Sequence, residues 1–197
     1  MAIAELDAIV EQSLRSFYQD ICDAELCGRE NEMVNLYALG HLAKHIRQGT
    51  MLHDLTQIGI EVTVRQLPRL HHELKWMTVR KDLVIWEFPR TTLWKAEKPC
   101  NRMPNNEPLA VMEWKVNHFL NGGVHEENLA AHEQHKGDID WLRRTSCRIG
   151  GESFIGYSVL VQDTKIPKHL SCVRVQAGEV RSALSLPDNG ATGGPSA

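Results

Sequence analysis

Three residues of this chain have types and spacing that suit cation-assisted chemistry on a water or a phosphate. Glu113 and Lys115 stand two positions apart in an otherwise apolar segment, and Asp82 precedes Glu113 by 31 residues. If the segment is a strand, alternation places Glu113 and Lys115 on one face. Burying charges is costly unless they are paired. A cation bound beside Glu113, with Lys115 acting on a reacting water or a phosphate, would explain charges at these positions.

The same acid-x-lysine spacing occurs twice more, at Glu73–Lys75 and at Asp163–Lys165. Glu73 lies in a polar stretch after Pro68, and Asp163 follows an apolar segment with no helix pattern after it. Glu113 differs because its segment is apolar, an acid-bearing segment precedes it and a helical pattern follows. This context favours Asp82, Glu113 and Lys115 as the reactive set.

The apolar periodicity predicts the elements that hold these residues. Steps of three and four residues predict helices, and strict alternation or short apolar runs predict strands. In the second helix, Asn31 would be the N-cap and the buried stripe would be Leu36, Leu39, Ala43 and Ile46. The predicted helices are 3–21, 31–46 and 126–144, and the predicted strands are 58–66, 77–87, 109–116, 154–161 and 170–175.

This order indicates an α/β fold with a mixed central sheet of four to five strands flanked by helices. The length of 197 residues suits a single domain, which we place at 1–184. The last residues, 185–197, are rich in Gly, Pro, Ser, Asn and Ala, and we expect a disordered tail there.

With Asp82 on the second strand and the Glu-x-Lys triplet on the third, residues 31–161 resemble the restriction-endonuclease-like PD-(D/E)xK nuclease superfamily. The resemblance implies an α-β-β-β-α-β core, here with an extra N-terminal helix. It also implies that Asp82, Glu113 and the backbone carbonyl of Trp114 bind Mg²⁺, with Mn²⁺ as a substitute. Lys115 would orient the attacking water or help to deprotonate it. The chain departs from the pattern in having Lys81, not Pro, before Asp82.

Many members of that superfamily also use a glutamate on the first core helix. Glu32 would match as a catalytic residue because it lies at the start of the second predicted helix, and Glu30 is its rival. An acid in a first turn also stabilises the helix dipole without any catalytic role.

The net charge of −3 argues against binding a polyanion through bulk charge. A local basic groove remains open, because nucleic-acid binding depends on how charge is distributed. Arg80, Lys81, Arg143 and Arg144 are the candidates for such contacts. The resemblance makes nucleic acid the expected partner, with DNA favoured, and a homodimer is compatible with it.

Two other classes of protein fit the same residues. One is a non-catalytic protein that keeps the nuclease fold and binds nucleic acid or a partner. The other is a scaffold in which Asp82, Glu113 and Lys115 form only a structural salt-bridge network. Intact Asp82, Glu113 and Lys115 favour the enzyme over the non-catalytic protein, since a degenerate member would often have lost one of them.

The histidine and cysteine patterns argue against a zinc site and against a secreted protein. Two histidine pairs, His41–His45 and His132–His135, have helical spacing, but neither has the His-Glu-x-x-His form and zinc needs three or four ligands. The five cysteines include no Cys-x-x-Cys pair, which is typical of reduced thiols in a cytoplasmic protein. No apolar run is long enough for a membrane span.

Overall fold

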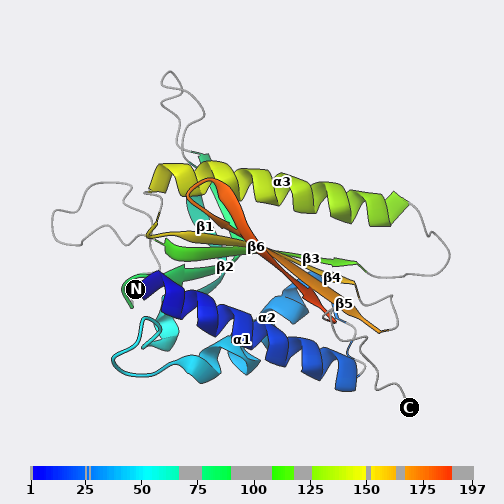
Figure 1. The fold of residues 1–197 in the computed structure, drawn as a ribbon, viewed down its shortest axis with the longest axis horizontal. Coiled ribbons are helices and arrows are strands. Elements are labelled where there is room, and N and C mark those ends of the chain that lie inside the picture. Colours follow the sequence, from blue (N-terminus) through cyan, green and yellow to red (C-terminus); the bar gives the residue numbers. More distant parts are fainter. Residues whose placement is uncertain are drawn as a thin grey trace, which may run out of the picture.

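The structure is a computed structural model, and it describes residues 2–24, 26, 28–66, 77–89, 108–117, 126–149, 152–162 and 167–187. A six-stranded sheet lies between two layers of helices, with α1 and α2 on one face and α3 on the other (Figure 1). The helices are α1 (Ala2–Asp23), α2 (Glu30–Gly40) and α3 (Glu126–Ile149), with short 3₁₀ helices η1 (Leu42–His45) and η2 (Leu55–Gln57). The strands are β1 (Ile58–Gln66), β2 (Met77–Trp86), β3 (Pro108–Asn117), β4 (Ile155–Gln162), β5 (His169–Gln176) and β6 (Glu179–Leu186).

The sheet is mixed, and its strands follow chain order from β1 to β6. Only β3 and β4 pair in parallel, while every other neighbouring pair is antiparallel. A parallel pair needs a long crossover, and α3 supplies it between β3 and β4. The predicted α/β class and mixed sheet are therefore confirmed.

The predicted number of strands is wrong by one. Strand β6 was missed because Glu, Arg and Ser interrupt its apolar residues. It pairs with β5 through Leu186, so 185–186 belong to the sheet and not to the expected disordered tail. The remainder of that tail, 188–197, lies outside the described residues.

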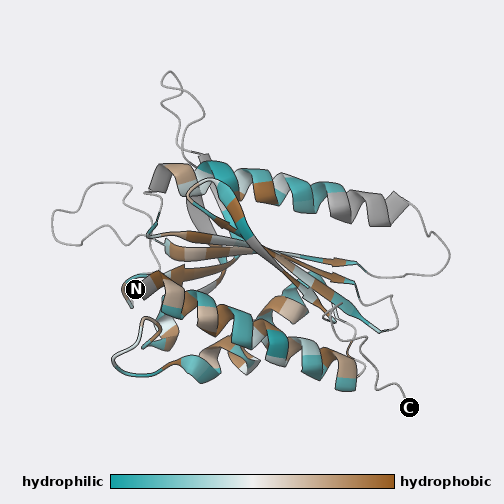
Figure 2. Ribbon diagram, viewed as in Figure 1, coloured by the Kyte–Doolittle hydropathy of each residue, from teal (hydrophilic) through white to brown (hydrophobic). Residues whose placement is uncertain are grey.

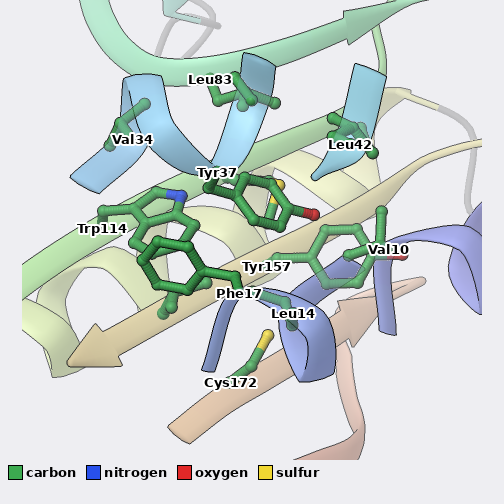
Figure 3. Packing of buried hydrophobic residues seen from close by; sticks show 14 of the residues in the cluster. Val10, Leu14, Phe17, Val34, Tyr37, Leu42, Leu83, Trp114, Tyr157 and Cys172 are labelled. Atoms are coloured by element: carbon green, nitrogen blue, oxygen red, sulfur yellow. The ribbon is translucent and has the colours of Figure 1, made fainter. Parts of the chain in front are cut away.

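The larger apolar core lies between the sheet and the layer of α1 and α2. The stripe of α1 is fully buried, as its spacing predicts: Leu6, Val10, Leu14, Phe17 and Ile21. At the centre of this core the rings of Phe17 and Tyr37 meet Trp114 of β3 (Figure 3). Their centroids are 5.1–6.0 Å apart, within the range of favourable aromatic pairs.

A smaller core lies between the sheet and α3, and it contains Val84, Trp86, Val111, Leu142, Phe154 and Val175. Gly156 of β4 lets α3 approach closely, since a Cβ at this position would lie 2.7 Å from Leu142 Cδ2. Figure 2 shows the hydrophobic strands between helices whose outer surfaces are largely hydrophilic. Helix α3 thus covers the sheet face that carries Val111 and its neighbour on the same face, Glu113.

Helix α2 differs from its prediction at both ends. It begins at Glu30, not Asn31, and ends at Gly40, after which η1 continues as a tighter helix. Its buried residues are Met33, Val34, Tyr37 and Ala38, whereas Leu39 of the predicted stripe is 57% exposed. The helix is therefore rotated relative to the prediction, which brings Glu30 toward the sheet.

Candidate functional site

A change of face within β1 and β2 creates the site. Glu61 of β1 has a φ of 58°, a left-handed conformation that side chains rarely adopt. On β2, Leu83 packs in the core of α1 and α2, whereas Lys81, two residues earlier, lies over Trp141 of α3. Regular alternation would place both on one face. The chain therefore changes face at Asp82, between them.

Asp82 lies where β2 and β3 stop pairing. The register of these strands begins at Leu83 opposite Met112. One step further, Asp82 Oδ2 accepts a hydrogen bond from the backbone N–H of Trp114 at 2.7 Å. The aspartate side chain thus replaces a ladder hydrogen bond and fixes its carboxylate beside Glu113.

Glu113 faces α3 and is almost completely buried. Its side chain is 6% exposed, and its Oε1 forms an ion pair with Lys81 Nζ. The Lys81 ammonium also lies 3.6 Å from the centroid of the Trp141 ring. Trp141, which the sequence did not indicate as part of the site, therefore contributes one wall.

Lys115 lies between acids from the two helix layers. Its Nζ is 3.5 Å from Glu30 Oε2 on α2 and 3.6 Å from Asp138 Oδ2 on α3. It also donates a hydrogen bond to the backbone carbonyl of Trp114. The carbonyl that the resemblance implies as a metal ligand therefore accepts a hydrogen bond from Lys115 in this structure.

Glu30, and not Glu32, is the acid of α2 that reaches the site. Glu32 Oε2 accepts a hydrogen bond at 2.7 Å from the backbone N–H of Arg29, the residue before the helix. This is the helix-capping role of an acid in the third helical position. The structure thus brings Glu30, and not Glu32, into contact with Lys115, while Glu32 caps its own helix. The catalytic role of Glu32 stays a prediction.

Burial raises the pKa of three acids of the site, Glu113, Glu30 and Asp138. Burial raises the pKa of Glu113 to about 7, opposed by Lys81 and reinforced by Asp82 and Asp138. Burial also raises the pKa of Glu30 and of Asp138, against the attraction of Lys115. For Lys115, burial alone would lower the pKa, but Glu30, Asp138, Asp82 and Glu113 together raise it. Lys115 is therefore a fixed cation at neutral pH.

Asp138 was not predicted as a site residue, although its spacing from neighbouring helix residues indicates the face on which it lies. His135, Asp138 and Leu142 recur at three- and four-residue steps, and Leu142 belonged to the predicted buried face of this helix. His135 Nδ1 lies 2.8 Å from Ser158 Oγ, and Ser158 is the cross-strand neighbour of Glu113. The face of α3 that carries these residues is thus the face over the site.

The histidine pairs form no zinc site within the part of the chain that the structure describes. Among the described residues, no three His, Cys, Asp or Glu side chains converge closely enough to hold a metal ion. His41 is buried, with its ring nitrogens near Ser16 and Asp20 of α1. The side chain of His132 lies outside the described residues.

The predicted nucleic-acid contacts separate into two groups. Lys81 is buried in the site, so the prediction that places it on a binding surface is corrected. Arg80 is 70% exposed and forms an ion pair with Glu61. Arg143 and Arg144 are exposed on α3 and line a cavity of about 400 Å³ beside Gly178 of the turn from β5 to β6.

Comparison of the chain with family models, with curated proteins and with solved structures finds no match. None of the described helices combines the length and the apolar character that crossing a membrane requires. Evidence for a function therefore comes from the residues of the site.

Proposed function

We propose that this protein is a Mg²⁺-dependent nuclease of the restriction-endonuclease-like type that hydrolyses phosphodiester bonds in nucleic acid, DNA being the favoured substrate. One observation carries the proposal: β2, β3 and α2 bring Asp82, Glu113, Lys115 and Glu30 to one place. The order α2-β1-β2-β3-α3-β4 also agrees with the core that the resemblance implies.

The chemical types of the donors suit a hard divalent cation, and binding would have to draw them together, because no three described His, Cys, Asp or Glu side chains converge in the structure. Glu30, Asp82, Glu113 and Asp138 carry four negative charges when ionised, and Lys81 and Lys115 carry two positive charges, which leaves a net charge of −2. Asp138 Oδ2 is buried and accepts no hydrogen bond from a described residue. Carboxylate and carbonyl oxygens are the ligands that Mg²⁺ and Mn²⁺ prefer. Asp82 and Glu113 would hold the cation, with the carbonyl of Trp114 beside them.

The residues would divide the work of hydrolysis between them. A bound Mg²⁺ supplies a more acidic water and a positive charge near the scissile phosphate. Lys115, protonated and held between Glu30 and Asp138, is suited to orient the water or a phosphate oxygen. Its raised pKa argues against a role in removing a proton from water. Glu30 keeps the ammonium of Lys115 in position.

The test separates cation binding from chemistry. Plasmid DNA, single-stranded DNA and RNA are incubated with the protein and Mg²⁺ or Mn²⁺, and cation binding is measured by calorimetry. We expect Asp82→Ala to lose cation binding and cleavage. Lys115→Ala keeps cation binding but loses about 10²–10⁴ in rate, as expected for a positioned acid–base or charged group.

Lys136→Ala is the matched control, because Lys136 is an exposed lysine of α3 that pairs with Glu133. It should cleave at the wild-type rate. Equal cleavage by the wild type and Lys115→Ala would place the activity elsewhere or in a contaminant.

The alternative is a nucleic-acid-binding or partner-binding protein that keeps the fold without the activity. The ion pair of Lys81 with Glu113 favours it, because this pair already neutralises one of the two carboxylates expected to bind the cation. Binding of DNA without cleavage of any of the three substrates would support this alternative over the nuclease.

A further inference from the structure

Lys81 is a buried lysine that the proposed chemistry does not use. Its side chain is only 8% exposed, and lysine is almost never buried to this extent unless it is paired. Two groups hold its ammonium: the carboxylate of Glu113 and the face of the Trp141 indole, 3.6 Å away. Taking an ammonium out of water is costly, so its position at this carboxylate needs an explanation.

The position of Lys81 is itself a product of the change of face in β2. Leu83 faces α1 and α2, and regular alternation would send Lys81 the same way. Instead Lys81 reaches Glu113 and α3, directly beside Asp82. The change of face at Asp82 therefore places the Asp82 carboxylate and the Lys81 ammonium close to Glu113.

We infer that Lys81 is the resident cation of the site: its ammonium neutralises Glu113 until a divalent cation binds, then leaves the carboxylate while remaining against Trp141. This inference rests on the proposed function, since it concerns the same cation site. It identifies Lys81 as the residue that sets the affinity of the site for divalent cations.

Two properties of the neighbours support this exchange. The ammonium and a divalent cation compete for the same oxygens of Glu113, because both are attracted by its negative charge. The Trp141 ring offers the displaced ammonium a second favourable contact, since cations bind well to the face of an indole.

Lys81→Met removes the charge and keeps the unbranched stem, and a thioether packs well against an indole. Mn²⁺ binding to the full chain is measured by calorimetry at pH 7.5 and 8.5, because Lys81 lowers the pKa of Glu113 and its removal raises the pH at which this carboxylate ionises. We expect Lys81→Met to bind Mn²⁺ at least 10-fold more tightly than the wild type. Arg80→Met removes the neighbouring, exposed positive charge and should change the affinity less than twofold.

A second measurement follows the ammonium itself through tryptophan fluorescence. Adding Mg²⁺ to the wild type should change the emission, because the ammonium moves relative to the Trp141 ring. Trp141→Phe removes the reporter and Lys81→Met removes the moving charge, so both should lack this change. Circular dichroism checks that each variant keeps its secondary structure.

The outcomes separate this inference from the proposed function. Equal or weaker Mn²⁺ binding by folded Lys81→Met overturns the role of Lys81, while metal-dependent cleavage by the wild type would leave the nuclease proposal intact. Failure of both the wild type and Lys81→Met to bind a divalent cation at millimolar concentration overturns both. Tighter binding by Lys81→Met that is lost again in Lys81→Met/Glu113→Gln supports the inference and locates the cation at Glu113.

Discussion

Trp114 and Glu113 are neighbours on β3, yet they face two regions of opposite character. The side chain of Trp114 is fully buried against the rings of Phe17 and Tyr37 (Figure 3). Glu113 is nearly as buried, but it lies among Lys81 and Asp82 on the side of α3. One strand thus separates an apolar core from a charged cluster.

The difference shows which region needs a functional explanation. Burial of the aromatic cluster stabilises the fold directly, because apolar surface is removed from water. Burial of the charged cluster opposes folding, and an apolar replacement of such groups is often as stable or more so. Stability therefore accounts for the aromatic side of β3 and does not account for the charged side.

The aromatic region should show the largest effect on stability. Trp114→Ala leaves a cavity between Phe17 and Tyr37 and should lower the free energy of unfolding by about 3–5 kcal/mol. Trp114→Phe keeps an aromatic ring and should cost less. Urea denaturation followed by circular dichroism measures both. A loss below about 1 kcal/mol for Trp114→Ala would show that this cluster does not dominate the core.

The charged region should make stability depend on pH. The unfolded chain releases the Glu113 proton near its ordinary pKa of 4.5, whereas the folded protein holds it up to about 7. The folded state therefore binds more protons in this window, so stability falls as pH rises. The full difference corresponds to about 3 kcal/mol between pH 4.5 and 7. Urea denaturation in a metal chelator, repeated at several pH values, measures it.

Glu113→Gln removes this group, so most of the decrease between pH 4.5 and 7 should disappear. Part of it will remain, because burial also raises the pKa of Glu30 and of Asp138. Glu133→Gln is the matched control, since Glu133 is an exposed acid of α3. A decrease that persists unchanged in Glu113→Gln would mean that Glu113 is not the titrating acid.

The fold could be predicted from the sequence where the periodicity was strong. The α1 stripe encodes burial on one face, and the apolar residues of β1 and β3 indicate strands; these elements were predicted correctly. Strand β6 could not be recognised in the same way, because its mixed composition depends on pairing with β5. The buried face of α2 was predicted wrongly because Ala43 and Ile46 were counted in its stripe, whereas the helix ends at Gly40.

The site could be predicted only in part, because some of its residues come together through tertiary contacts. The proximity of Asp82, Glu113 and Lys115 followed from adjacent strands, whose pairing the alternating segments indicated. Asp138 and Trp141 enter the site from α3, which is a tertiary contact that no local pattern of β2 or β3 contains. The inward turn of Lys81 depends on the change of face at Asp82, which the apolar pattern of β2 does not reveal.

The packing of α3 on the sheet should give the next largest effect. Gly156→Ala places a Cβ within 3 Å of Leu142 Cδ2 and Cβ, so α3 must shift outward or Leu142 must leave its position. Overpacking of this kind costs about 1–3 kcal/mol. Urea denaturation measures it, and Gly137→Ala is the control because nothing lies within 4 Å of that Cβ. Gly137 lies in a helix, so this control should stabilise slightly. Equal stability of wild type and Gly156→Ala would show that α3 is loosely packed.

The smallest effects should distinguish the two acids at the start of α2. Glu30 contacts Lys115, whereas Glu32 accepts the hydrogen bond of the Arg29 N–H. Glu30→Ala should therefore reduce the rate of DNA cleavage about tenfold, which corresponds to about 1.4 kcal/mol, with little change in stability. Glu32→Ala should reduce the free energy of unfolding by about 0.5–1 kcal/mol through loss of the cap, with the cleavage rate unchanged. Cleavage assays and urea denaturation on both variants form a crossed comparison. If Glu32→Ala lost cleavage while Glu30→Ala retained it, the helix acid of the site would be Glu32, and the ion pair of Glu30 with Lys115 would have no role in the reaction.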